Sequence, residues 1–481
     1  MNYEVVIGLE VHAQLATQTK IFCGCKLQFG SEPNTQTCPI CLGMPGVLPV
    51  LNKRAVEYAV RMGLAVHCTI REQSIFARKN YFYPDLPKGY QISQYEEPLA
   101  EAGFVDVLDS EEKVRRIRIN RIHMEEDAGK SVHDESYIKT NETMIDLNRC
   151  GTPLIEIVSE PDLRSAQEAA QYLTKIRQMV RWLGVCDGNM EEGSLRCDAN
   201  ISLRPVGETK LGTKTELKNM NSIRNVERAI ETEIKRQTRK LNAGEAIVQE
   251  TLLWDEAENK VRPMRSKEEA HDYRYFPEPD LIPLILNRDW IEEIRAGLPE
   301  MPEARQARWV ADYELPEYDA GVLSSDRALS DYYDTLAKAV DPKQASNWVM
   351  GEVMRILNDE KWEIEQLKAS PEDLITIINM VNKGTISNSA GKKVLAEVAR
   401  TGQKPEETVK ALGLVQVSDS SELESVLAQV LDNHPDELGR YLGGKTQLFG
   451  FFVGQAMKAT RGKANPQMLN DLLKKMLEDR K

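Results

Sequence analysis

The segment Val5-Val6-Ile7-Gly8-Leu9-Glu10-Val11-His12 has the composition of a β-strand and lies close to the N-terminus. Residues two apart on a strand lie on the same face, so we expect Glu10 and His12 to point the same way. A carboxylate and an imidazole on one face can hold a cation. The strand therefore predicts that a metal-binding, catalytic domain begins at the start of the chain.

Four cysteines follow this strand with the spacing C-x-C-x12-C-x2-C, at Cys23, Cys25, Cys38 and Cys41. The Cys-Pro-x-Cys turn lets two thiolates reach one tetrahedral ion. The cluster offers no open coordination position, which favours a structural zinc over a catalytic one. The alternative is four buried thiols without a metal. Eight cysteines in 481 residues are too few for a disulfide framework, so a reducing compartment, by default the cytoplasm, is expected.

Length and composition limit the possible classes of protein. A chain of 481 residues is expected to form roughly three domains. A net charge of −13 argues against a protein that coats nucleic acid through a general positive field, although it leaves room for a local basic patch. No apolar run approaches the ~20 residues that a membrane helix needs, and the N-terminus lacks a basic signal-peptide region.

Residues 1–295 predict an α+β domain, a mixed α/β catalytic cradle with an antiparallel-rich sheet. Ser165-x-x-Glu168 is a capping box that predicts a helix ending at Gly184, and a second helix is expected from Ser222 to Leu241. Strands are expected at Glu4–Gln14, Val114–Glu125, Thr143–Leu147, Leu154–Val158, Asp198–Arg204 and Thr213–Leu217.

Strand signals nearly vanish after a hinge at Gly297–Pro302. Residues 296–405 predict a helical domain with Trp309, Trp348 and Trp362 in its core. A polar stretch from Gly402 to Ser421 is the second expected linker. Residues 411–481 predict a small all-α tail domain.

Acidic residues recur inside the apolar strands. Glu10 and His12 are mirrored by His123 and Glu125, and Glu156 interrupts the run Leu154–Val158. Asp198 and Glu216 lie on two further strands. A buried carboxylate is costly unless it is paired or bound to a metal, so the set as a whole predicts a divalent cation, most naturally Mg²⁺ holding a nucleotide phosphate. Taken singly, each acid is more readily explained as a solvated or salt-bridged side chain.

The C-terminal region contains two further patterns. Gly439–Thr446 matches the phosphate-loop pattern G-x4-G-K-[ST], but the residues before it predict a helix where the loop requires a strand, so we reject it as a nucleotide site. Residues 445–481 hold eight Lys/Arg and three Asp/Glu, and four of these basic residues lie in Gly444–Pro466, near Phe449, Phe451 and Phe452. Basic residues beside aromatic ones fit an RNA-binding surface, and equally a helix with an aromatic core face and a solvated basic face.

Long, specific segments resemble the B subunit of the aspartyl/glutamyl-tRNA amidotransferase family. The clearest are Asn-Met-Glu-Glu-Gly-Ser-Leu-Arg-Cys-Asp-Ala-Asn at 189–200 and Asp-Tyr-Arg-Tyr-Phe-Pro-Glu-Pro-Asp-Leu at 272–281, and the resemblance runs nearly end to end. It implies an ATP-dependent ligase that amidates Glu-tRNA(Gln) or Asp-tRNA(Asn). ATP converts the side-chain carboxylate to an acyl phosphate, which ammonia from a partner then attacks.

The resemblance also implies partners and site residues. The partners are an amidase (glutaminase) subunit, a small third subunit and the misacylated tRNA, which the helical and tail domains would contact. The four cysteines match zinc-bearing members of the family. Lys79, Tyr81 and Lys88 lie where the family gates ammonia, which is a hypothesis here. The Mg²⁺ and ATP pocket falls on Glu10, His12, Glu125, Glu156, Asp198 and Glu216.

Two other classes of protein remain as rivals. One is a tRNA-binding scaffold in which the acids are structural, and the other is a metallohydrolase that acts alone on a phosphoester. Glu-tRNA(Gln), Asp-tRNA(Asn) or both are the expected substrates.

Overall fold

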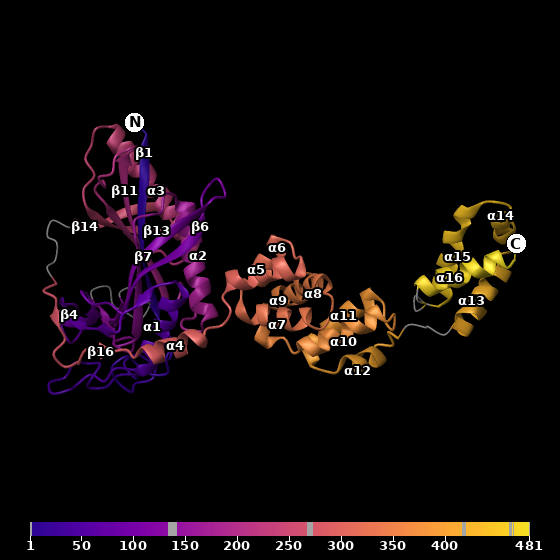
Figure 1. Ribbon diagram of the computed structural model, residues 1–481, viewed down its shortest axis with the longest axis horizontal. Helices are drawn as coiled ribbons and strands as arrows, with labels where there is room; N and C mark the ends of the chain where they lie inside the picture. Colours follow the sequence, from indigo (N-terminus) through magenta and orange to yellow (C-terminus); the bar gives the residue numbers. More distant parts are fainter. Residues whose placement is uncertain are drawn as a thin grey trace. The chain divides into compact units, whose positions relative to one another are not determined.

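The computed structural model describes residues 2–132, 142–266, 273–415, 420–460, 464 and 466–480 (Figure 1). The chain divides into two compact units, Met1–Pro302 and Glu303–Lys481. None of the described helices combines the length and apolar character needed to cross a lipid bilayer.

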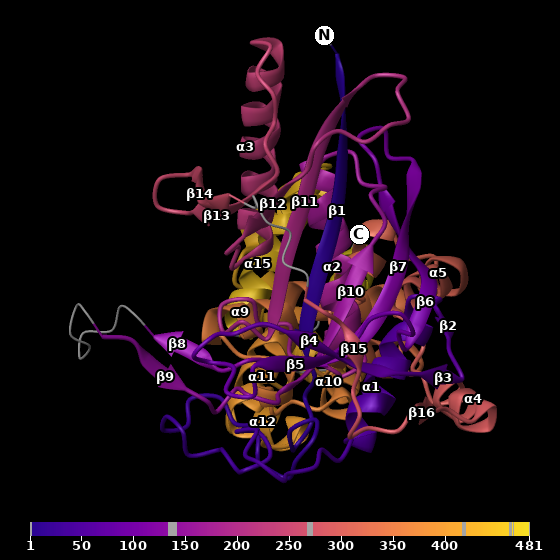
Figure 2. The same cartoon turned by 90° about the vertical axis from the view of Figure 1, so that its left-hand side faces the viewer.

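A nine-stranded sheet forms the frame of the first unit, in the order β14-β13-β12-β11-β1-β10-β7-β6-β2 (Figure 2). All neighbouring strands are antiparallel except β12 and β13, which are parallel. This confirms the expected α+β class with an antiparallel-rich sheet. The strands are β1 (Tyr3–Gln14), β2 (Thr69–Ile70), β6 (Ala100–Leu108), β7 (Val114–Glu126), β10 (Pro153–Ser159), β11 (Leu195–Pro205), β12 (Thr215–Lys218), β13 (Glu250–Asp255) and β14 (Lys260–Ser266).

Strand β1 lies in the middle of this sheet and has one apolar and one polar face. Leu9, Val11 and Ala13 are fully buried in the first hydrophobic core. Helices α1 (Lys53–Ala65), α2 (Ala166–Trp182) and α3 (Ile223–Asn242) pack against the sheet on this side. The polar residues of β1 therefore lie on the opposite face.

Both expected helix starts in the first unit are present. Ser165 caps α2 by accepting a hydrogen bond from the Glu168 amide at 3.1 Å. The Glu168 carboxylate accepts from the Arg164 amide at 2.8 Å, one residue before the amide that a reciprocal capping box would use. Ser222 caps α3 in the same way, through the Asn225 amide.

Among the described residues, three small sheets accompany the large one. The largest joins β15 (Phe276–Pro277), β4 (Phe76–Asn80) and β5 (Tyr90–Gln94), and β5 packs against β7 (Figure 2). The others pair β16 (Leu284–Ile285) with β3 (Gln73–Ser74), and β8 (Lys130–Val132) with β9 (Met144–Asp146). The expected strand at Thr143–Leu147 corresponds to β9, outside the large sheet.

The described part of the second unit contains helices and no strand, which confirms the expected loss of strands. The expected hinge at Gly297–Pro302 lies between α4 (Arg288–Ala296) and α5 (Pro302–Tyr313). Trp309 and Trp348 are buried in the second hydrophobic core and Trp362 packs against it. The helices that follow are α6 (Glu317–Leu323), α7 (Arg327–Ala337), α8 (Pro342–Trp348), α9 (Met354–Glu360), α10 (Pro371–Asn382), α11 (Asn388–Thr401) and α12 (Pro405–Ala411), with a π-helical turn at Val349–Val353.

The second expected linker is partly wrong. Helix α12 lies inside it, and Val409 of this helix is buried in the second core with Leu414 packed against the same core. Residues 416–419 of the expected linker lie outside the described residues.

A third hydrophobic core is built from α13 (Ser420–Asp432), α14 (Pro435–Leu442), α15 (Phe449–Ala459) and α16 (Pro466–Glu478). Phe452 is fully buried there, and Phe449 and Phe451 pack against it. The three phenylalanines of the tail thus pack in its hydrophobic core. The division into domains 1–295, 296–405 and 411–481 stays a prediction.

Candidate active site

The register of the large sheet gathers the expected acidic residues on its polar face. On β1, Glu10 is opposite Asp198 of β11, and His12 is opposite Glu156 of β10. Glu156 is in turn opposite His123 of β7. Directly opposed residues of an antiparallel pair lie on the same face, so the cation-binding side chains expected from the sequence meet there. They form two groups of three.

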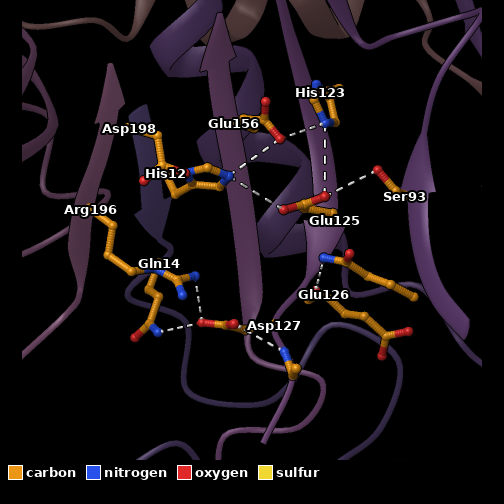
Figure 3. Close-up of polar contacts among 12 residues, drawn as sticks. His12, Gln14, Ser93, His123, Glu125, Glu126, Asp127, Glu156, Arg196 and Asp198 are labelled. Atoms are coloured by element: carbon orange, nitrogen blue, oxygen red, sulfur yellow. Dashed lines mark hydrogen bonds and ion pairs between the residues drawn. The ribbon is translucent and has the colours of Figure 1, made fainter. Parts of the chain in front are cut away.

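The first group, which we call the histidine group, consists of His12, Glu125 and Glu156 (Figure 3). Glu156 Oε2 lies 3.3 Å from His12 Nε2 and 3.3 Å from His123 Nε2. Glu125 Oε1 lies 4.0 Å from His12 Nε2, and Glu125 Oε2 accepts from Ser93 Oγ at 3.2 Å. The carboxylate of Glu156 is thus held between two imidazoles.

These contacts shift the acid–base properties of the histidine group. Burial disfavours the imidazolium, but the carboxylates of Glu156 and Glu125 outweigh it, raising the pKa of His12 and raising that of His123 to about 9. Burial also opposes the charged carboxylates. The histidines nevertheless hold the pKa of Glu156 well below its ordinary value and lower that of Glu125.

The second group, which we call the carboxylate group, consists of Glu10, Asp198 and Glu216. Burial raises the pKa of Glu10, and the negative charges of Glu156, Asp198 and Glu216 raise it further. Lys218, two residues after Glu216 on β12, forms an ion pair with Asp198 and lies 3.1 Å from Glu216 Oε1. This lysine offsets part of the negative charge of the group.

Both groups have donor sets that suit divalent cations. Each group offers three ligand atoms within 4.8 Å of one another. The carboxylate group supplies only oxygen, which suits Mg²⁺, and the histidine group adds an imidazole, which also suits transition metals. The pKa of Glu10 is raised by burial and then by the negative charges around it, and a bound cation would relieve that crowding of charge. The residues therefore fit the expected metal, in two places.

A third set of contacts borders the histidine group and was missed from the sequence. Asp127 Oδ2 accepts from Gln14 Nε2 at 2.7 Å and from Arg196 at 2.9 Å (Figure 3). Burial opposes the Asp127 carboxylate, but Arg196 and Arg149 lower its pKa. Gln14 and Arg196 each lie two residues from an expected site residue on the same strand. The two-residue spacing of a strand, applied once more from His12, Asp198 and Glu216, would have predicted Gln14, Arg196 and Lys218 on the same face.

Lys79 and Tyr81 lie next to each other, with the Lys79 ammonium 6.0 Å from the centre of the Tyr81 ring, whereas the ammonium of Lys88 pairs with a residue of β7. Lys79 lies on β4 with its ammonium 5.1 Å from the centre of the Tyr273 ring. Burial opposes its charge, but Glu125 and then Tyr275 and Glu156 raise its pKa, which places it near the histidine group. Tyr81 donates to Gln91 Oε1 at 3.1 Å. Lys88 forms an ion pair with Glu126, which follows Glu125 on β7.

The four expected cysteines converge. The sulfur atoms of Cys23, Cys25, Cys38 and Cys41 all lie within 4.8 Å of one another, and those of Cys38 and Cys41 are 3.9 Å apart. Four Zn–S bonds of about 2.3 Å in a tetrahedron separate the sulfurs by about 3.8 Å, so the cluster fits a zinc ion. A hydrogen bond from Cys23, helped by the Cys38 amide and the charge of Lys20, lowers the pKa of Cys41 to about 4.

The phosphate-loop pattern at Gly439–Thr446 has the helical context expected from the sequence. Residues up to Leu442 belong to α14, and the described element directly before α14 is helix α13 where a phosphate loop would follow a strand. Backbone amides inside a helix are already hydrogen-bonded, so this segment lacks the geometry that cradles a phosphate.

Comparison with known proteins agrees with this arrangement of residues. Residues 5–292 match the family model described as "GatB/GatE catalytic domain", and residues 331–477 match "GatB domain". The B subunit of aspartyl/glutamyl-tRNA(Asn/Gln) amidotransferase from Thermodesulfovibrio yellowstonii is 54% identical over 480 residues, which cover 100% of both chains. The chain belongs to the family of aspartyl/glutamyl-tRNA(Asn/Gln) amidotransferase B subunits.

Further members of this family are similarly close. The B subunits from Geotalea daltonii and Chlorobaculum tepidum are each 55% identical over 479 residues, 99% of this chain and 100% of theirs. The amidotransferase family thus covers the sheet, the helical region and the tail of this chain, which confirms the resemblance seen in the sequence.

Proposed function

We propose that the chain catalyses ATP-dependent amidation of Glu-tRNA(Gln), Asp-tRNA(Asn) or both, as one component of a larger amidotransferase. Family membership over the whole chain supports the overall reaction. The observation that carries the site assignment is the pair of three-residue groups on one face of the sheet. Two neighbouring cation sites suit a reaction in which the substrate carboxylate must approach the phosphates of ATP.

The two groups would divide the chemistry as follows. A carboxylate is a poor electrophile, so the reaction begins by transferring the γ-phosphoryl group of ATP to the substrate carboxylate. Bound Mg²⁺ would lower the repulsion between these anions and stabilise the charge of the transferring phosphoryl group. The carboxylate group, beside β12, would hold the cation that stabilises the transferring phosphoryl group. The histidine group, beside β10 and β7, would orient the other anion, the substrate carboxylate.

The positive groups around Glu156 and Glu125 control the charge of these two carboxylates. The two imidazoles keep Glu156 ionised and therefore available as a ligand. Lys79 contributes a further positive charge near Glu125.

In the second step of the reaction, ammonia must displace phosphate from the acyl phosphate. A carboxyl oxygen leaves with the phosphate and an amide bond forms.

Water competes with ammonia for the acyl phosphate, which favours a closed approach for ammonia. We assign the gate to Lys79, Tyr81 and Lys88. Lys88 and Glu126 both line a cavity of about 200 Å³ that lies next to Cys23 and Cys41.

The remaining parts are assigned supporting roles. The four cysteines would hold a structural zinc that fixes the loop between β1 and α1. The helical domain and the tail would contact tRNA, and an amidase subunit, held together with this chain by a small third subunit, would supply ammonia. The name of the relatives, which marks each as one subunit among several, supports a multi-subunit enzyme acting on tRNA.

Reconstitution with the amidase partner tests this function. The complex should convert both misacylated tRNAs, or one of them, in a reaction that requires ATP and glutamine. Each tRNA is assayed separately, with free ammonium replacing glutamine as a control for the partner's contribution. A complex that binds tRNA but forms no amide with either nitrogen source would refute the proposal and favour a tRNA-binding scaffold. Hydrolysis of a phosphoester by the chain alone would favour the metallohydrolase.

A further inference from the structure

Lys20 is a buried lysine with no carboxylate partner among the described residues. Its relative exposure is 0%, and it is one of the largest fully buried side chains of the chain. Its ammonium Nζ lies 3.6 Å from Cys41 Sγ, which is its one hydrogen-bond partner in the described structure. A buried ammonium is destabilising unless a nearby group carries negative charge. The cysteine cluster is the group in position to supply it.

The backbone holds Lys20 firmly against this cluster. Its amide donates to the Cys25 carbonyl at 3.0 Å, and the next amide, of Ile21, donates to the Gly151 carbonyl at 2.9 Å. The Lys20 carbonyl accepts from Asn52 Nδ2 at 3.3 Å. Because these three contacts lie on both sides of the residue, they fix the backbone of Lys20 beside the cluster.

The charge of a loaded cysteine site explains the position of this lysine. Four thiolates carry −4 and zinc carries +2, so a four-cysteine zinc site has a net charge of −2. An ammonium has no lone pair and cannot bind zinc, but it can donate a hydrogen bond to a zinc-bound sulfur. Outer partners of this kind orient the metal ligands and tune the affinity of many metal sites.

We propose that Lys20 is the outer-sphere cation of the four-cysteine site, where it donates a hydrogen bond to Cys41 and offsets part of the negative charge. It acts as a positioning residue and takes no part in the amidation chemistry. The inference rests on the proposed zinc site, and the experiment below separates the two claims.

The rate of zinc release from the purified full-length chain is the direct test. Zinc content is measured by elemental analysis, and transfer of zinc to excess 4-(2-pyridylazo)resorcinol is followed by absorbance. Lys20→Met should release zinc roughly tenfold to a hundredfold faster than the wild type, because losing an outer partner typically lowers metal affinity by that factor. Lys20→Arg keeps the charge and should release zinc more slowly than Lys20→Met. Lys26→Met is the matched control, because Lys26 is exposed beside Cys25.

Different outcomes overturn different claims. A wild-type chain without zinc would overturn the zinc site and this inference with it. Zinc-loaded Lys20→Met that releases zinc within about twofold of the wild-type rate would overturn the inference alone. An equal acceleration in Lys26→Met would also overturn it, because general surface charge would then explain the effect. Amidation by the wild-type complex is measured separately and decides the proposed function.

A second measurement applies even if Lys20→Met does not fold in the wild-type background. With Cys23, Cys25, Cys38 and Cys41 all replaced by Ser, the ammonium of Lys20 has lost its negative partner. Lys20→Met should then raise the melting temperature, whereas it lowers it when the cysteines are present. A lowered melting temperature in the serine background would contradict the proposal.

Discussion

Glu156 Oε2 lies 3.3 Å from His12 Nε2, across the antiparallel pair of β1 and β10. This contact depends on the register of two neighbouring strands. Moving β1 by one residue would turn His12 toward the apolar face and bring Val11 to the polar one. Burial of Leu9, Val11 and Ala13 against the helices therefore fixes the position of the histidine group as well as the fold.

The raised pKa of His123 predicts how stability changes with pH in metal-free protein. Its folded pKa of about 9 exceeds its ordinary value of about 6.5. The protonated ring thus stabilises the fold fully below about pH 6.5, and this contribution is lost as the pH rises through 9. Urea unfolding in chelator should show falling stability over this window, and His123→Asn should flatten the slope. An unchanged slope in the variant would show that other groups titrate there.

The cysteine cluster predicts one bound zinc per chain. Cys38→Ser removes one of the four sulfur ligands and should lower both the zinc content and the melting temperature. Cys68→Ala is the control, since Cys68 is buried in the first core away from the cluster and should retain zinc. Elemental analysis and thermal melts check both. Native wild-type protein with no zinc would refute this prediction.

The tail domain is predicted to contribute to tRNA binding. Truncation after Val415 removes the third core and leaves α12 and Leu414 on the second core. A deletion that begins at residue 411 would remove part of this packing, so the truncated chain should end at Val415. The truncated chain should bind tRNA more weakly while the partner still hydrolyses glutamine. Equal tRNA affinity of the two forms, measured by filter binding, would remove the tail from the tRNA-binding surface.

The large sheet was predictable because its central strands alternate apolar and polar residues. In β1 the alternation marked His12 as a residue of the polar face, and in β10 Glu156 stood out as the one acid in an apolar run. The four cysteines were found because their spacing is local and specific. Both features depend on residues close together in the chain.

Contacts between distant segments were not predictable in the same way. Strand β15 pairs with β4 about two hundred residues earlier, with Phe276 opposite Arg78, and neither strand has a long alternating pattern. The separation of the expected acids into two groups was also missed. It arises because Glu10 and His12, two residues apart on β1, each meet a different neighbouring strand. Lys20 was missed because a lysine in a loop has no sequence signal for burial.

The most direct test of the central claim is ATP cleavage that depends on misacylated tRNA, measured in the complex without any ammonia donor. The wild-type complex should form ADP when Glu-tRNA(Gln) or Asp-tRNA(Asn) is added. Glu125→Gln and Glu156→Gln should lower this rate by about a hundredfold or more, the usual cost of removing a group that stabilises charge in the transition state. Their tRNA affinity should stay within about threefold of wild type, because binding would come mainly from other surfaces. The exposed control Glu111→Gln should keep the wild-type rate. Wild-type rates in both Glu125→Gln and Glu156→Gln would contradict the account.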